Sequence, residues 1–145
     1  MPVPPKEFAN LIQEFVPFNK FLGIHIDEAA EGYVRLKLPY RDEFIGDSSR
    51  PALHGGVIST LIDTAGGFAV WTQLANLDDR VSTIDLRVDY LAPGAPEMLF
   101  ADAKIVRVGN RVGVCDIRCW QPSQPERTVA TGKAVYNIKR KEDSP

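Results

Sequence analysis

Cysteine and histidine are scarce in this chain, with two of each among 145 residues. So few scattered side chains do not make a zinc site, and we expect no metal. Cys115 and Cys119 fall on one face of a predicted strand, roughly 13 Å apart at ~3.3 Å per residue, which is too far for a disulfide. We therefore expect two reduced core thiols, as in a cytoplasmic protein.

Long apolar segments and excess charge are absent as well. No run of about 18 apolar residues occurs, and the N-terminus has no charged segment followed by an apolar one. The formal net charge is −2, which gives no strong basic field for nucleic acid or an anionic membrane. We therefore expect a cytoplasmic protein that binds neither nucleic acid nor membranes, built as one domain over residues 1–145.

Hydrophobic periodicity predicts two helices and six strands. Apolar residues at positions 8, 11, 12 and 15 have helical spacing, in a short N-terminal helix that Pro17 closes. The expected strands cover residues 21–28, 33–38, 83–90, 98–108, 111–121 and 127–139, with turns at Glu31-Gly32 and Gly109-Asn110. Because helices and strands do not alternate, the pattern predicts an α+β fold with an antiparallel sheet.

The second helix is long and is expected from about Gly55 to Ala75, after a polar loop over residues 39–53. Loops of this length in compact domains are often functional. Inside the helix, Gly66-Gly67 costs ~1 kcal/mol per glycine relative to alanine. This cost is explained if the helix lies tight against a sheet.

The start of this helix carries the most specific chemical signal, His54-Gly55-Gly56 followed by Asp63. Unpaired backbone N–H groups and a partial positive charge at a helix N-terminus suit a polarised oxygen. Asp63 lies two turns further on, among residues expected to be buried, where a carboxylate is costly unless it has a function. The alternative interpretation is a buried acid that only bridges parts of the structure. Together, the helix start and the acid indicate half of an active site.

Taken in order, these features resemble the hotdog fold: a strand pair, a polar loop, a helix that opens on His-Gly-Gly with an acid seven residues after the second glycine, and four more strands. Within that fold, the chain is similar to the phenylacetic-acid-degradation type of acyl-CoA thioesterase. The likeness covers about residues 18–139. It implies about six strands wrapped on one long central helix, and hydrolysis of an acyl-CoA to a free acid and coenzyme A without a cofactor.

The resemblance also implies roles for individual residues. Gly56 would donate its backbone N–H to the thioester carbonyl, and Asp63 would act as general base on water or as nucleophile. Thr83 stands where relatives place a hydroxyl that helps to hold the water, and His54 opens the same turn. By strand alternation Thr83 points to the same side as Asp85 and Arg87, away from the apolar residues of its strand, so this role requires a bulge or a cleft between subunits.

Further residues are candidates for binding the acyl end of the substrate. Ser48 takes the position where several relatives carry an amide that helps to polarise the carbonyl, and Gly55 belongs to the same helix start. Phe68 is a candidate wall of the acyl pocket, together with Phe44 and Trp71. Aromatic residues at such spacing are more often simply part of the core.

Basic residues are candidates for binding the phosphates of coenzyme A. Arg107 and Arg111 bracket the predicted Gly109-Asn110 turn, from which they could clamp one phosphate. The other candidates are Arg50, Arg80 and Lys133.

The spacing of Gly56 and Asp63 predicts a homo-oligomer. Along one helix the two residues are ~10.5 Å apart at 1.5 Å per residue, whereas an attacking group must lie within a few Å of its carbonyl. Two antiparallel copies can each lend a helix start to the other's Asp63. The expected assembly is therefore a dimer, or a dimer of dimers.

Two other functions fit the same features. One is a hydratase or dehydratase on acyl-CoA, in which His54 and Asp63 act as acid and base across a dimer. The other is a protein that binds acyl-CoA without catalysis, which would have little need for a carboxylate at position 63.

Overall fold

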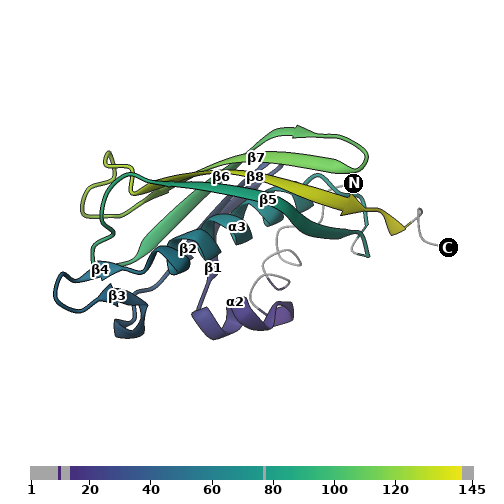
Figure 1. Ribbon diagram of the computed structural model, residues 1–145. Coiled ribbons are helices and arrows are strands. Elements are labelled where there is room, and N and C mark those ends of the chain that lie inside the picture. Colours follow the sequence, from purple (N-terminus) through teal and green to yellow (C-terminus); the bar gives the residue numbers. More distant parts are fainter. Residues whose placement is uncertain (1–9, 11–13, 77, 142–145) are drawn as a thin grey trace.

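One antiparallel sheet of six strands wraps around a long helix in the computed structural model, which describes residues 10, 14–76 and 78–141 (Figure 1). The strands are β1 (His25–Ala30), β2 (Tyr33–Leu38), β5 (Arg80–Tyr90), β6 (Leu99–Val108), β7 (Val112–Trp120) and β8 (Ala130–Lys139). Their order is β1-β2-β6-β7-β8-β5, so β1 and β5 form the two edges of the sheet. The predicted α+β architecture is confirmed.

The long helix α3 (Gly55–Trp71) buries its apolar side against one face of the sheet (Figure 1). Gly66 provides the close approach that the sequence predicts, because a side chain there would collide with the Tyr136 hydroxyl of β8. Gly132 of β8 meets Ile62 in the same way. Helix and strand therefore pack at a distance that only glycine permits at these two positions.

The helix ends at Trp71, short of the predicted end at Ala75. Thr72 follows as the C-cap, and its hydroxyl donates to the carbonyl of Ala69 at 2.6 Å. The same hydroxyl accepts the N–H of Gly32 at 2.8 Å. Thr72 thus ties the helix end to the β1–β2 turn, through a contact between residues far apart in the chain.

The short helix α2 (Pro17–Leu22) corrects two predictions for the N-terminal part. Pro17 opens this helix instead of closing one, because the first helical position needs no N–H. Phe21 lies in α2 and not in a strand, and Gly23 ends the helix with φ of 80° before β1 begins. The helix predicted over residues 8–15 falls mostly outside the described residues. Within the described part, no helix has both the length and the apolar character needed to cross a membrane.

The polar loop before α3 contains structure that its sequence did not indicate. A 3-10 turn, η2 (Asp42–Phe44), leads into a two-stranded sheet of β3 (Ile45–Asp47) and β4 (Ala52–Leu53). Asp47 closes the tip by accepting the N–H of Ser49 at 2.9 Å. The N–H of His54 donates to the carbonyl of Phe44 at 2.8 Å, so the end of η2 holds the start of α3.

The two cysteines lie on the helix-facing side of β7, buried and unpaired as predicted. The thiol of Cys115 donates to the carbonyl of Gly66 at 3.2 Å. Burial raises the pKa of Cys115 to about 12 and raises that of Cys119 as well. Both thiols therefore stay protonated at neutral pH.

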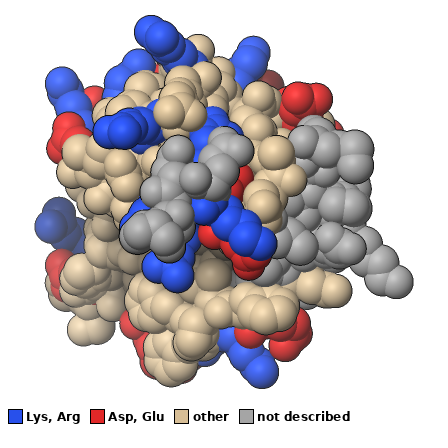
Figure 2. All heavy atoms as spheres, turned by 90° about the vertical axis from the view of Figure 1, so that its right-hand side faces the viewer, with Lys and Arg blue, Asp and Glu red and all other residues tan. Residues whose placement is uncertain are grey.

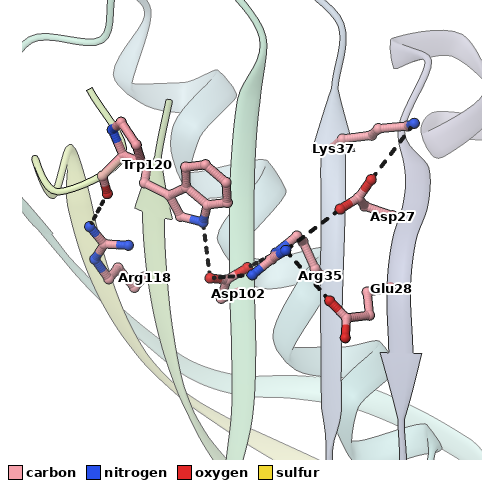
Figure 3. A network of polar contacts seen from close by, with 8 residues as sticks. Asp27, Glu28, Arg35, Lys37, Asp102, Arg118 and Trp120 are labelled. Atoms are coloured by element: carbon pink, nitrogen blue, oxygen red, sulfur yellow. Dashed lines mark hydrogen bonds and ion pairs between the residues drawn. The ribbon is translucent and has the colours of Figure 1, made fainter. Parts of the chain in front are cut away.

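The opposite face of the sheet is polar, and an ion network joins four of its strands there (Figure 3). Arg35 of β2 lies at its centre and donates to Asp102 of β6 at 2.6 Å. Its guanidinium also pairs with Glu28 at 3.5 Å and Asp27 at 3.8 Å, and lies over the ring of Trp120. Each charge in this network has a partner, so the network ties strands together on the side away from α3.

Candidate active site

A β-bulge in β5 decides which way Thr83 faces. Thr83 pairs with Tyr136 of β8, and Asp85 pairs with Val135, so Ile84 is an extra residue between them. One extra residue reverses the alternation of side chains along a strand. Thr83 therefore faces α3 while Asp85 faces outward, which is the arrangement that the role of Thr83 required.

Asp63 is held in place by two hydroxyl groups from the sheet. The Thr83 hydroxyl donates to Oδ1 of Asp63 at 2.7 Å. The Tyr136 hydroxyl donates to the main-chain carbonyl of Asp63, also at 2.7 Å. Burial is the main cause that raises the pKa of Tyr136, so its hydroxyl remains a donor at neutral pH. Asp63 itself is only half-buried, in contrast to the full burial of Leu61, Ile62 and other neighbours on the helix.

A cleft of about 460 Å³ opens beside Asp63 and Thr83. Phe68 and Trp71 form part of its wall, with ring centroids 6.0 Å apart in an edge-to-face arrangement. Phe68 therefore lines a cleft, and its role in binding the acyl group stays a prediction. Phe44 was expected to join this wall, but it is 4% exposed and lies in the core near the helix start instead. The volume and the aromatic walls suit a small organic ligand.

Sequence reasoning missed the third side of the cleft, which comes from the segment around α2. Phe15, Val16 and Asn19 line the cleft together with the α3 residues. The only local signal is the aromatic spacing of Phe15, Phe18 and Phe21, which does not tell which side meets α3. All three phenylalanines keep more than half of their surface exposed.

The start of α3 lies apart from the cleft, and His54 caps it. The Nδ1 atom of His54 accepts the N–H of Gly56 at 2.8 Å, which is the N–H expected to bind a thioester carbonyl. The carbonyl of Gly55 accepts the hydroxyl of Tyr90 at 3.1 Å. Ser48 is exposed in the β3–β4 turn. None of Ser48, His54, Gly55 and Gly56 lines the cleft that contains Asp63.

The two predicted phosphate-binding arginines lie at the β6–β7 connection, with Arg107 near the end of β6 and Arg111 in the connection itself. The connection has three residues, Gly109 to Arg111, where two were expected, because Arg111 belongs to the turn and not to a strand. Arg140, which the sequence did not single out, donates to the carbonyls of Gly109 at 3.2 Å and Asn110 at 3.1 Å. Arg107 and Arg111 are exposed.

This connection lies near the C-terminal end of α3, where Val70 packs against Gly113 of β7. Lys and Arg side chains gather over the centre and upper half of this end of the molecule (Figure 2). In the part of the chain that the structure describes, no three His, Cys, Asp or Glu side chains are grouped as metal ligands.

The chain is similar to known proteins in sequence and in fold. A family model described as the thioesterase superfamily matches residues 51–128. The chain is 39% identical to a Halobacterium salinarum protein named as an esterase, over 91% of this chain and 93% of that protein. It is 30% identical to the medium/long-chain acyl-CoA thioesterase YigI of Escherichia coli, over 85% of this chain and 86% of that protein. A solved Shewanella oneidensis protein related to the thioesterase superfamily has a TM-score of 0.80 at 29% identity, over 92% of this chain and 94% of that one.

Proposed function

This chain belongs to the thioesterase superfamily and is a thioester hydrolase, and from that premise we propose that it hydrolyses acyl-CoAs to free acids and coenzyme A. The observation that carries this proposal is the Asp63 carboxylate, held by the Thr83 hydroxyl at 2.7 Å beside an aromatic-walled cleft. The relative YigI is named for medium- and long-chain acyl-CoA. The His-Gly-Gly helix start and the acid at position 63 support membership of the phenylacetic-acid-degradation type.

In the proposed reaction, the Asp63 carboxylate takes a proton from water, whose oxygen attacks the carbonyl carbon of the thioester. The C–S bond breaks, and coenzyme A leaves as the thiolate and takes up a proton. Thr83 donates to Oδ1 of Asp63, which orients the carboxylate and leaves its other oxygen for the water. The second route is attack by the carboxylate itself, through an anhydride that water then hydrolyses.

The carbonyl oxygen needs a donor that the same helix does not provide. Gly56 and Asp63 lie in one regular helix, ~10.5 Å apart at 1.5 Å per residue. We infer that each active site combines Asp63 of one subunit with Gly56 of the partner subunit, whose N–H stabilises the developing oxyanion. In this arrangement the thioester oxygen displaces His54 Nδ1 as the acceptor of that N–H.

Strand β5 supports such a dimer, because it is a sheet edge of eleven residues with exposed apolar side chains. Ile84 is 58% exposed, and Leu91 just after the strand is 61% exposed. An unpaired edge of this length is a template for pairing with another strand. A second copy that pairs along β5 would continue the sheet and cover these side chains.

The contacts of β5 also suggest the register of this pairing. Thr83, near the start of the strand, is bonded to Asp63, and Tyr90, at its end, is bonded to Gly55. Antiparallel pairing of two β5 strands centred between Leu86 and Arg87 would place Thr83 opposite the partner's Tyr90. In that register Asp63 lies beside the helix start of the partner subunit.

Arg107 and Arg111 are the proposed contacts for the phosphates of coenzyme A. Both are exposed at the end of the molecule that carries the β6–β7 connection, where Arg140 fixes the turn between them. Antiparallel pairing along β5 would bring this end to the side of the dimer where the partner's helix start lies. Guanidinium groups bind phosphate oxygens through two parallel hydrogen bonds.

The test is release of coenzyme A, followed with a thiol reagent, from short, medium, long and aromatic acyl-CoAs. Asp63→Asn keeps the shape of the side chain and should lower kcat by 10² or more, the scale for loss of a general base. The control is Asp85→Asn, on the outward face of the same sheet, which should leave kcat within about twofold of the wild type. Full activity in Asp63→Asn would refute the assignment of the base.

The same experiment separates the two other functions. A hydratase requires His54 as the acid or base, whereas the hydrogen bond from Gly56 N–H to His54 Nδ1 supports a capping role. Release of coenzyme A in the wild type therefore favours hydrolysis over hydration, since hydration leaves the thioester intact. Binding of acyl-CoA without release would favour the non-catalytic alternative.

A further inference from the structure

Among the described residues, three buried hydrogen-bond donors have no acceptor: Nε of Arg41, which does not line the cleft, and the side-chain nitrogens of Asn19 and Trp71. Asn19 of α2 is 2% exposed, and its side-chain Nδ2 has no hydrogen-bond partner among the described residues. Nε1 of Trp71, the last residue of α3, is also buried and has no hydrogen-bond partner among the described residues. Buried polar groups without a partner are rare in folded proteins, because water satisfied them before folding. Each such group calls for an explanation.

The donors of Asn19 and Trp71 both belong to residues that line the cleft beside Asp63. Asn19 comes from α2 and Trp71 from the end of α3, so the two approach the cleft from different elements. The main-chain carbonyl of Asn19 already has a separate task, since it accepts the N–H groups of Gly23 at 2.9 Å and Ile24 at 3.0 Å. The Asn19 side chain has no part in that cap, so its burial at the cleft is not explained by the local fold.

We propose that the cleft selects acyl groups that carry a neutral oxygen along the chain, such as a keto group, which accepts hydrogen bonds from Asn19 Nδ2 and Trp71 Nε1. This inference rests on the proposed function, because it takes the cleft beside Asp63 as the acyl pocket. Asn19 and Trp71 would then determine specificity, at a distance from the reacting carbonyl.

The charges of the cleft favour a neutral oxygen over a carboxylate. Asp63 is the only charged side chain among the described residues that line it. A second carboxylate, on the substrate, would meet the negative charge of Asp63 with no Lys or Arg to offset it. A keto group has the acceptor that the two donors need and carries no charge.

The experiment compares octanoyl-CoA with its 4-oxo, 5-oxo, 6-oxo and 7-oxo analogues. A keto group replaces one methylene with little change in size, and moving it along the chain finds the position that meets the donors. We expect the wild type to prefer at least one analogue by about tenfold in kcat/KM, because a site built to pair a polar group discriminates against a substrate that lacks it. Equal or lower values for every analogue would overturn the proposal and leave ordered water as the partner of these donors.

Substitutions at Asn19 and Trp71 test whether these two residues cause the preference for the keto analogue. Asn19→Leu should bring the ratio of kcat/KM between the preferred analogue and octanoyl-CoA to 1 or below, and Trp71→Phe should reduce it in part. Asn137→Leu, at an exposed position on the outward face of β8, is the matched control and should keep the wild-type ratio. A preference that persists in both pocket variants would refute the assignment. If Asn19→Leu does not fold, the analogue series in the wild type and Trp71→Phe still decide.

The outcomes separate this inference from the proposed function. A wild type that hydrolyses octanoyl-CoA and its analogues at equal rates keeps the thioesterase function and loses the specificity. A wild type that releases coenzyme A from no thioester loses both.

Discussion

A pair of complementary heterodimers tests whether each active site is shared between two subunits. The two substitutions are Asp63→Asn, which removes the proposed base, and Gly56→Pro, which removes the proposed donor N–H. Proline is tolerated in the first turn of a helix, and Gly56 is the second residue of α3. Loss of the base is expected to cost 10² or more in kcat, and loss of one oxyanion donor about 10²–10³.

The expected activities of the two heterodimers follow from which subunit contributes Asp63 and which contributes Gly56 to each site. A heterodimer with Asp63→Asn on one chain and Gly56→Pro on the other has one site with both defects and one intact site, if sites are shared. It should therefore have about half of the wild-type activity per dimer. A heterodimer with both substitutions on one chain and none on the other should have only background activity, because each of its sites then has one defect.

Sites contained within one chain predict the reverse result for the two heterodimers. The measurement uses two affinity tags, with tandem purification of each mixed dimer, followed by release of coenzyme A and a thermal melt to show folding. Half activity in the double-substituted heterodimer and background in the other would refute the shared site. An active Gly56→Pro homodimer would show instead that another group binds the oxyanion.

Three further predictions concern the supports of the site and the core. Thr83→Val should lower kcat about tenfold through loss of the hydrogen bond to Asp63. Thr83→Ser keeps the hydroxyl and should retain most of the wild-type kcat. Equal kcat in the two variants would show that the Thr83 hydroxyl has no part in the mechanism. Gly66→Ala should lower the free energy of unfolding by roughly 1–3 kcal/mol in urea titrations, because the added methyl collides with the Tyr136 hydroxyl, and an unchanged midpoint would contradict this. Because burial raises the pKa of Cys115 to about 12, the unfolded chain loses this proton first as pH rises. The free energy of unfolding should therefore fall above about pH 9, by up to 1.4 kcal/mol per pH unit, and less steeply in Cys115→Ala.

Prediction from sequence was most accurate where neighbouring residues carry the signal. The alternation of strand residues identified the strands of the main sheet, and the two core cysteines were placed correctly on one face of β7. Where it was wrong, either a distant contact or a local signal with two possible meanings was responsible. Thr72 ends α3 early because its hydroxyl meets the β1–β2 turn, and Phe21 lies in a helix because Pro17 can open one.

The site divides in the same way. Asp63 and Phe68, which both line the cleft, could be proposed from the sequence because a carboxylate and an aromatic ring on a helix with a glycine start form a local pattern. Asn19 was not identified, since nothing in its neighbourhood shows that α2 packs beside the end of α3. Arg140 was missed for a similar reason, because it holds a turn about thirty residues earlier in the chain.

By itself, the sequence determined the helix with its His-Gly-Gly start, the acid two turns later and the strands that cover it. Periodicity and backbone propensity act over a few residues, so they can be read along the chain. Only the tertiary structure decided that Thr83 faces Asp63, because the bulge at Ile84 arises from the register of β5 against β8. The rise of one helix already predicted that Asp63 lies apart from the helix start, whereas only the tertiary structure decided that the cleft opens beside Asp63, because its walls come from α2, α3 and the sheet.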